Sequence, residues 1–241
     1  MFHNQYISES KTVFFARPEQ MDRFWEHGWR HFGTTFYRYN FTIHESAICQ
    51  VFALRVRLSA FQLTKKQRKI WNRCQSFRTI VQPINLRPEI HELFEMHKER
   101  FESNIPDSIY TFLSDRPHKI PCKALEIAVY DGDLLVAASF FDDGQEGISS
   151  IYGMFRPGYE KYSLGIYTML AEISHASQQG KAFYYHGYCY DVPSFYDYKK
   201  QFAGLEYYDW GSQNWIVYQD QPFEIDNGSQ TNQWDTDDLI F

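Results

Sequence analysis

The chain of 241 residues lacks several features that would assign it to a common class of protein. No apolar run approaches the roughly 18 residues needed to cross a bilayer, and the first ten residues lack the basic start and apolar stretch of a secretory signal. Its four cysteines form no CxxC pair, which argues against a zinc ribbon and a disulfide framework, and no HExxH motif is present. These absences predict a cytoplasmic protein with reduced thiols and no membrane partner.

Acidic residues are missing from one long stretch. Between Glu45 and Glu89 there is no Asp or Glu, although nine Lys and Arg residues fall there. Residues 1–120 carry 18 basic against 12 acidic residues, whereas residues 121–241 carry 6 against 18. We therefore expect a polyanion to dock on the basic half while the acidic half repels it, despite the net charge of −6.

The second half of the chain has the clearest pattern of secondary structure. Three strands, a helix and a further strand are predicted at residues 125–130, 134–141, 147–155, 164–178 and 182–190. Asp131-Gly132 is a hairpin signal, and the helix connection should make the last strand parallel to the third. This order resembles the core of the GNAT acyltransferases, where a splayed strand pair and a helix N-terminus form the acyl-donor cleft. We expect an α+β, GNAT-like acyltransferase fold with a mixed sheet and flanking helices.

The first half is predicted to form a smaller, basic α/β region. Short helices are expected at residues 19–25 and 88–101, and strands between residues 38 and 58, which are rich in Phe, Tyr, Ile and Val. Because the charge changes sign near residues 83–105, we predict three parts: a basic region at 1–100, a GNAT-like domain at 101–221 and an acidic, mobile tail at 222–241.

The start of the helix predicted at 164–178 bears on the acyl donor. Ser163 is a candidate N-cap, and Gly165 would let a ligand approach free helix amides, although an ordinary capped helix would look the same. Acetyl-CoA enzymes of the resembled fold usually carry Q/R-x-x-G-x-G/A at this place. Here Tyr162 and Tyr167 stand at the first and last positions, and the second tyrosine should crowd a pyrophosphate. CoA is therefore disfavoured, and no cofactor is predicted.

Short motifs follow one another along both halves of the chain. They are GWRHFG at 28–33, FYR at 36–38, LRV at 54–56, TKKQRK at 64–69, ISSIY at 148–152, FRP at 155–157, YSLG at 162–165, YHGY at 185–188 and YDYK at 196–199. In order and spacing this set resembles the arginyl- and leucyl-tRNA–protein transferases of the N-end rule. The likeness extends over roughly residues 14–210.

The resemblance implies transfer of an amino acid of the Arg or Leu class from aminoacyl-tRNA to an amine, above all the N-terminal amine of a protein or peptide that begins with Asp or Glu. The ester is already activated, so orientation should supply most of the acceleration, with proton transfer and oxyanion stabilisation supplying the rest. The candidate catalytic residues are Tyr152, Ser163, Gly165, Tyr185, His186 and Tyr188. The oxyanion is expected near the amides after Ser163, and no single proton relay stands out.

The substrates require positive charge at two places. Lys199, which matches the family's Y-K, is the first candidate partner for an acidic acceptor, with Lys200 second and Tyr198 beside them, although a solvated surface lysine is the alternative. The candidate tRNA-binding residues can pair with the phosphates of an acceptor stem without reading bases, unless they form only a solvated face. These residues are Arg55, Arg57, Lys65, Lys66, Arg68 and Lys69.

Two departures from the resembled family affect the prediction. The family's cysteine cluster between Y-R and L-R-I is absent, since residues 39–50 offer only His44 and Cys49, so no metal site is predicted. Tyr162 replaces the arginine before S-L-G, so the identity of the transferred amino acid stays open. Two other functions also remain: a CoA-dependent N-acetyltransferase of the same fold, and a non-catalytic module that binds tRNA or peptide.

Overall fold

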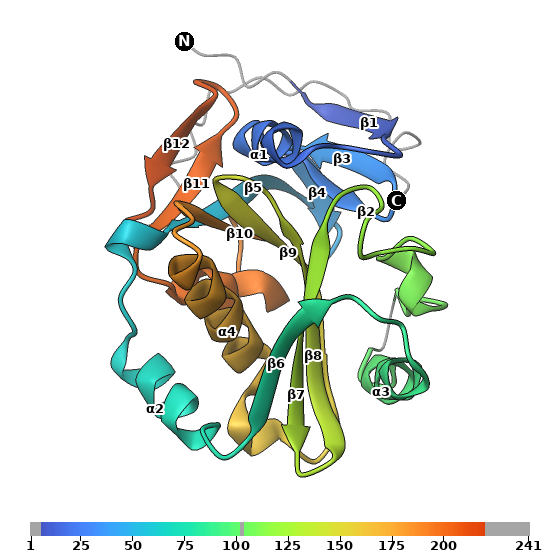
Figure 1. The fold of residues 1–241 in the computed structure, drawn as a ribbon. Coiled ribbons are helices and arrows are strands. Elements are labelled where there is room, and N and C mark those ends of the chain that lie inside the picture. The colour runs from blue at the N-terminus through green and yellow to red at the C-terminus, as the bar shows by residue number, and fades with distance from the viewer. Residues whose placement is uncertain (1–5, 102–103, 220–241) are drawn as a thin grey trace.

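The structure is a computed structural model that describes residues 6–101 and 104–219, so the predicted tail at 222–241 lies outside the described residues. Most strands belong to one large mixed sheet (Figure 1). They are β4 (Phe41–His44), β5 (Ala47–Arg57), β6 (Arg78–Pro83), β7 (Ala124–Asp131), β8 (Leu134–Asp143), β9 (Gly147–Phe155), β10 (Phe183–Tyr190), β11 (Leu205–Asp209) and β12 (Asn214–Val217). The strand order is β12-β11-β5-β10-β9-β8-β7-β6, and β4 pairs with β5.

A smaller sheet and a few helices complete the fold. The small sheet has the order β1-β3-β2 and consists of β1 (Ser8–Thr12), β2 (Arg30–Phe32) and β3 (Thr35–Tyr39). The α-helices of the described residues are α1 (Pro18–Glu26), α2 (Lys65–Arg73), α3 (Pro88–Lys98) and α4 (Leu164–Gln178). Single 3₁₀ turns are η1 (Leu58–Ala60), η2 (Ile109–Thr111) and η3 (Glu160–Tyr162), and η4 (Phe195–Gln201) is longer. None of these helices is long and apolar enough to cross a membrane, as far as the described chain goes.

The predicted α+β class with a mixed sheet is confirmed. Strands β7, β8 and β9 form the antiparallel meander, and β10 returns parallel to β9 after α4. Strand β5 lies between β10 and β11, while β6 forms the other edge of the sheet. Segments from both sides of the predicted boundary near residue 100 therefore share one sheet.

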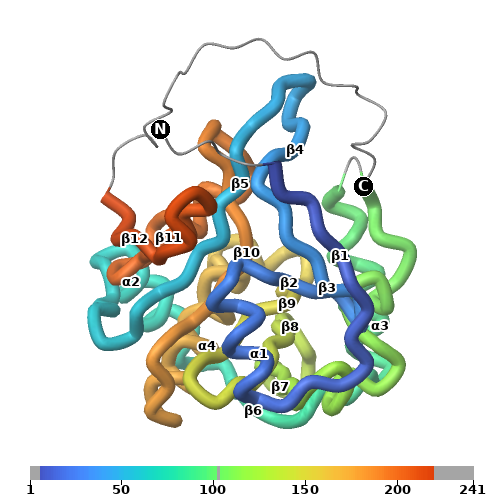
Figure 2. The backbone as a smooth tube through the Cα atoms, turned by 90° about the horizontal axis from the view of Figure 1, so that it is seen from above, coloured from blue at the N-terminus to red at the C-terminus, as the bar shows by residue number. Residues whose placement is uncertain are grey.

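Helices cover both faces of the meander, which explains why β8 is buried along almost its whole length. Helix α4, with α2 beside it, packs on one face, and α3 packs on the other (Figure 1). Seen from above, α1 and the small sheet lie over β8, β9 and β10 (Figure 2). Trp25 of α1 is buried there against Tyr185 of β10, with 5.6 Å between the ring centroids. The layers thus meet where β9 and β10 lie side by side.

Candidate functional site

Strands β9 and β10 are paired only where they begin. Residues 183–185 of β10 lie opposite residues 147–149 of β9, and beyond this point β9 stays bonded to β8 while β10 stays bonded to β5. A β-bulge between Tyr185 and Gly187, with φ of 104° at Gly187, marks the place where the strands part. We call this separation the fork; it is bounded by residues 149–152 of β9 and 185–188 of β10.

Arg30 of β2 occupies one side of the fork. Its Nη1 donates to Oγ of Ser149 at 2.5 Å and to the carbonyl of Tyr185 at 3.4 Å. Its Nη2 donates to the carbonyl of Ser150. The guanidinium therefore satisfies backbone acceptors of both strands where strand pairing has ended.

Lys199 of η4 reaches the same place from the other side. Its Nζ donates to the carbonyl of Tyr188 at 3.2 Å. A Cβ at Gly187 would lie 2.8 Å from Nζ of Lys199 and 4.0 Å from Nη2 of Arg30, so glycine is needed here both for space and for its left-handed φ. Two positive side chains thus converge on one backbone position.

The two cations at the fork form no ion pair with another described side chain. Burial and, to a smaller extent, the neighbouring Arg30 together lower the pKa of Lys199 to about 7. Neither side chain takes part in the ion pairs of the described residues, whereas Lys200 pairs with Asp197 at 2.8 Å. Of the two predicted lysines, Lys199 is therefore the one whose charge is available to an anion.

His186 supports η4 from the strand below. Its Nε2 lies 2.9 Å from the carbonyl of Lys199, which can only accept, so Nε2 carries the proton. Burial lowers the pKa of His186 to about 3, so the ring is neutral near pH 7. Its buried Nδ1 has no hydrogen-bond partner within the described ranges. His186 holds the backbone of Lys199 in place, and a catalytic role for it stays a prediction.

The three predicted tyrosines lie in different places. Tyr188 donates to the carbonyl of Gly28 at 2.7 Å and is buried under the small sheet. Tyr185 packs against Trp25, and burial raises its pKa to about 12. Tyr152 lies on the α3 side of the sheet, where its buried hydroxyl has no partner among the described residues. The fork does not bring their hydroxyls together, and their roles also stay predictions.

A pocket of about 120 Å³ opens next to the first turn of α4, between α2 and η4. Ser163 and Tyr198, both predicted site residues, line it. Ser163 is the N-cap residue of α4, as predicted, but its side chain makes no capping hydrogen bond. Ser163 directly precedes α4 but has the left-handed φ of 55°, so its hydroxyl is not directed at the helix amides as an extended N-cap residue would be. A Cβ at Gly165 would meet only the ring of Phe155, at 3.7 Å.

The position of Tyr167 removes one argument against CoA, namely that this side chain would crowd the pyrophosphate. Its hydroxyl lies 2.8 Å from Oγ1 of Thr79, and the side chain is buried between α4 and the sheet. It therefore points into the core and does not crowd the loop before α4. The expectation of a crowded pyrophosphate site is wrong, and another argument is needed to disfavour CoA.

Helix α2 presents four predicted tRNA-binding residues to solvent. Lys65, Lys66, Arg68 and Lys69 are all exposed. Thr64 begins the helix through a capping box with Gln67, in which each side chain accepts from the other residue's amide, at 3.2 and 3.0 Å. The buried face of α2 fixes the helix against α4, and the basic face stays free for phosphates.

The structure also corrects the prediction that Arg55 binds tRNA. It is only 6% exposed, and its Nε donates to Oε2 of Glu206 at 2.6 Å. Its guanidinium carbon also lies 3.9 Å from the ring centroid of Phe183 and 4.3 Å from that of Trp215. A side chain held in this way cannot reach a phosphate. Arg57 binds the other oxygen of Glu206 at 2.7 Å, but its side chain is 46% exposed.

One buried cluster offers three ligand types for a metal among the described residues: His31, Cys122 and Asp142. Nε2 of His31 lies 2.6 Å from Oδ2 of Asp142, and Sγ of Cys122 donates to Oδ1 at 3.2 Å. Nitrogen and oxygen ligands of one tetrahedral zinc ion would be about 3.3 Å apart. Nδ1 of His31 must donate to the carbonyl of Gly33, 2.9 Å away, so the short contact to Asp142 needs a second proton. The geometry fits a shared proton better than an ion.

Two residues near the fork were not predicted as site residues from the sequence. Arg30 lies inside the GWRHFG motif, so this motif could have identified it as a candidate site residue. Glu172 is a fully buried carboxyl of α4, and its signal was a single acidic residue on the apolar face of a predicted helix.

Comparison with known protein families matches both halves of the chain to models of one transferase family. The model of the arginine-tRNA-protein transferase C terminus matches residues 89–209, and the model of its N terminus matches residues 3–69. The chain belongs to the arginine-tRNA-protein transferase family, and the resemblance inferred from the motifs is confirmed.

The similar curated proteins are aspartate/glutamate leucyltransferases. That of Acinetobacter baumannii is 28% identical over 184 residues, which cover 74% of this chain and 66% of the relative. That of Nitrosococcus oceani is 27% identical over 205 residues, which cover 82% of this chain and 79% of the relative. The chain thus spans just under two thirds of the length of the Acinetobacter relative.

Solved structures are more distantly similar. FemX matches 79% of this chain and 65% of its own chain, with a TM-score of 0.47 and 10% identity. L-PGS from Bacillus licheniformis matches 58% of this chain and 48% of its own, with a TM-score of 0.40 and 17% identity. These scores are too low to assign the fold.

Proposed function

We propose that this protein transfers leucine from leucyl-tRNA to the N-terminal amine of proteins or peptides that begin with Asp or Glu. The observation that carries the acceptor side is the pair of cations at the fork, Arg30 and Lys199, neither of which forms an ion pair among the described residues. A carboxylate between them would gain charge-assisted hydrogen bonds and relieve the repulsion between the two cations. Neutral acceptors would leave that repulsion in place.

The pocket beside α4 supports an aliphatic donor residue. Ile70, Ile166 and Phe202 supply apolar surface, and Lys66 is the charged residue of the lining. Among the described residues no carboxylate lines the pocket, so an arginine side chain would have to bury its charge without a partner there, which is costly. Leucine would need only apolar contact. The names of the similar leucyltransferases agree with this choice.

The GNAT-like fold and the location of the substrates belong to the same proposal. The meander, the helix crossover and the parting of β9 from β10 support the fold assignment. Helix α2 would hold the acceptor stem, and the aminoacylated 3′ end would pass the pocket to the fork, with the oxyanion near the amides that follow Ser163. We place the reaction in the cytoplasm, where charged tRNA is found. Family membership, not the loop before α4, argues against acetyl-CoA.

The test is transfer by the purified chain from a mixture of charged tRNAs to Asp- and Asn-led peptides, with products weighed by mass spectrometry. Leucine should be found on the Asp-led peptide. Lys199→Ala should lower kcat/KM for that peptide about ten- to hundredfold, since a hydrogen bond to a charged group contributes roughly 1.5–3 kcal/mol. It should barely alter the Asn-led peptide or the affinity for leucyl-tRNA.

Lys200→Ala is the matched control, because Lys200 pairs with Asp197 on η4 and should not touch the acceptor. Equal losses for Asp- and Asn-led peptides in Lys199→Ala would remove the acidic-acceptor assignment. Binding of acetyl-CoA without binding of deacylated tRNA would instead favour an N-acetyltransferase, and tRNA binding without turnover would favour a non-catalytic module.

A further inference from the structure

Glu172 lies in the layer between α4 and the main sheet and is completely buried. Tyr184 of β10 donates its hydroxyl proton to Oε2 at 2.7 Å. The other oxygen, Oε1, has no partner of good hydrogen-bond geometry within residues 6–101 and 104–219, although the hydroxyls of Ser139 and Ser150 lie close enough to Glu172 to stabilise its charged form. Ser150 of β9 completes the group, which we call the Glu172 cluster: Glu172, Ser139, Ser150 and Tyr184.

Packing does not account for a carboxyl at this position. The neighbouring buried residues of α4 include Leu170, Ile173 and Ala176, so an aliphatic side chain would suit the layer better. Burial raises the pKa of Glu172 to about 7, while the hydroxyls of Ser139, Tyr184 and Ser150 and the positive charge of Arg30 lower it in part. The group can therefore take up or release a proton near neutral pH, which is what a general base requires.

The cluster is connected to the fork. Ser150 is its partly exposed member, and the carbonyl of Ser150 accepts from Arg30 at the acceptor site. Tyr184 directly precedes Tyr185, the last residue of β10 that pairs with β9. The hydroxyl of Ser150 is therefore a neighbour of the buried Glu172, while the carbonyl of the same residue lies at the fork, where the acceptor amine would be held.

We propose that Glu172 takes the proton that the acceptor amine loses, with the Ser150 hydroxyl as the intermediate carrier. This inference rests on the proposed aminoacyl transfer. The amine nitrogen bonds to the ester carbonyl carbon, its proton passes to Ser150 as the Ser150 proton passes to Glu172, and the bond from carbon to the ribose oxygen breaks. The same proton returns through Ser150 to the ribose oxygen, so an N–H bond is exchanged for an O–H bond and Glu172 ends as a carboxylate.

The pH dependence of single-turnover transfer tests this relay. In the wild type, log kcat/KM should rise with a slope of about two at low pH, because both the amine and Glu172 must lose a proton. Glu172→Gln keeps an acceptor for Tyr184 but cannot titrate, so the slope should fall to about one and kcat should fall about 10²- to 10⁴-fold. The affinity for leucyl-tRNA should not change. Ser150→Ala, which keeps Glu172 but breaks the relay, should lower kcat similarly.

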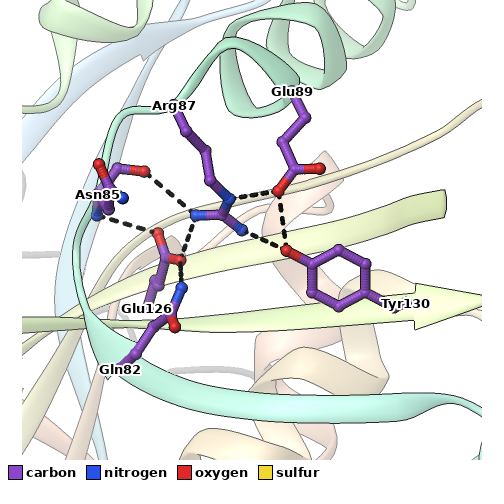
Figure 3. Close-up of polar contacts among 6 residues, drawn as sticks. All are labelled: Gln82, Asn85, Arg87, Glu89, Glu126 and Tyr130. Carbon is purple, nitrogen blue, oxygen red and sulfur yellow. Dashed lines mark hydrogen bonds and ion pairs between the residues drawn. The ribbon is translucent and has the colours of Figure 1, made fainter. Parts of the chain in front are cut away.

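Glu126 supplies the matched control because it is another fully buried carboxyl, but both of its oxygens accept hydrogen bonds. Figure 3 shows Gln82 and Arg87 donating to Oε1, at 2.6 and 2.5 Å, and the amide of Asn85 facing Oε2 at 3.3 Å. Glu126→Gln should destabilise the fold but keep the slope of about two. An active wild type with the same slope and kcat in Glu172→Gln would overturn the relay alone, as would loss of slope in Glu126→Gln. A wild type that transfers nothing would overturn the proposed function with it.

Discussion

At the scale of single residues, the charge of Lys199 depends on what occupies the fork. Burial and the nearby Arg30 bring its pKa to about 7, so the free site holds a mixture of ammonium and neutral amine near neutrality. An acidic side chain bound between Lys199 and Arg30 would favour the charged form and raise that pKa again. Binding an acidic acceptor above pH 7 therefore requires the uptake of a proton.

This linkage predicts a pH-dependent KM. The KM for an Asp-led peptide should rise by up to about tenfold per pH unit above pH 7, as the free enzyme loses the Lys199 proton. Lys199→Arg carries a permanent charge, so its KM should stay nearly flat from pH 7 to 9. Asn-led peptides provide the comparison, since their KM should not follow this titration in either protein. A wild-type KM independent of pH would show that Lys199 does not meet the acceptor carboxylate.

At the scale of elements, α2 is built as a basic surface. Thr64 caps it, Gln67 and Ile70 face the core, and the exposed Lys and Arg side chains have no acidic residue of the same helix to neutralise them. Such a surface binds a polyphosphate with a strong dependence on salt, because each contact releases counter-ions.

Reversal of three α2 charges should separate tRNA binding from folding. In Lys65→Glu/Lys66→Glu/Arg68→Glu, the affinity for tRNA should fall, and the slope of log K against log salt should lose about two to three units. Thermal unfolding should be nearly unchanged, since all three side chains are exposed. A triple reversal elsewhere, at the exposed Arg23, Arg116 and Lys119, should keep most of the slope. Equal losses in both variants would point to net charge instead of a site on α2.

At the scale of the whole molecule, the position of Arg30 depends on how the small sheet docks on the large one. The residue next to it, His31, forms a buried contact with Asp142 of β8, and Cys122 donates to the same carboxylate. Because β2 pairs within the small sheet only with β3, these side-chain contacts tie it to the main sheet. The proposed acceptor site is therefore assembled from two sheets.

Loss of His31 should affect both stability and acceptor binding. His31→Ala leaves the buried Asp142 without its partner and should lower the free energy of unfolding by about 3–5 kcal/mol, measured by urea titration. The remaining folded protein should show a raised KM for Asp-led peptides, because Arg30 loses its anchor. Arg38→Ala is the control in the same sheet; its pair with Glu9 is exposed, so the change should stay below about 1 kcal/mol. If His31→Ala is as stable as Arg38→Ala, the contact with Asp142 is not the anchor.

The site divides into what local patterns could predict and what they could not. Lys199 was predicted from a motif, and the structure brings it to the fork; the free basic face of α2 was likewise predictable from a run of bases without acids. Arg55, from the same run, was misassigned, because its partner Glu206 lies 151 residues away and nothing near Arg55 signals it. The sequence shows the charge of a side chain at its own position, but it does not show which distant residue will be its counter-ion.

The sequence by itself determined the meander, the crossover helix, the family and the sign of charge along the chain, because periodicity, turn residues and motifs act over a few neighbouring positions. Only the tertiary structure decided that Arg30 meets Ser149 across 119 residues, and that Glu172 is completely buried and accepts a hydrogen bond from Tyr184. Burial and pairing set the protonation of such groups, and both arise only when distant segments pack together.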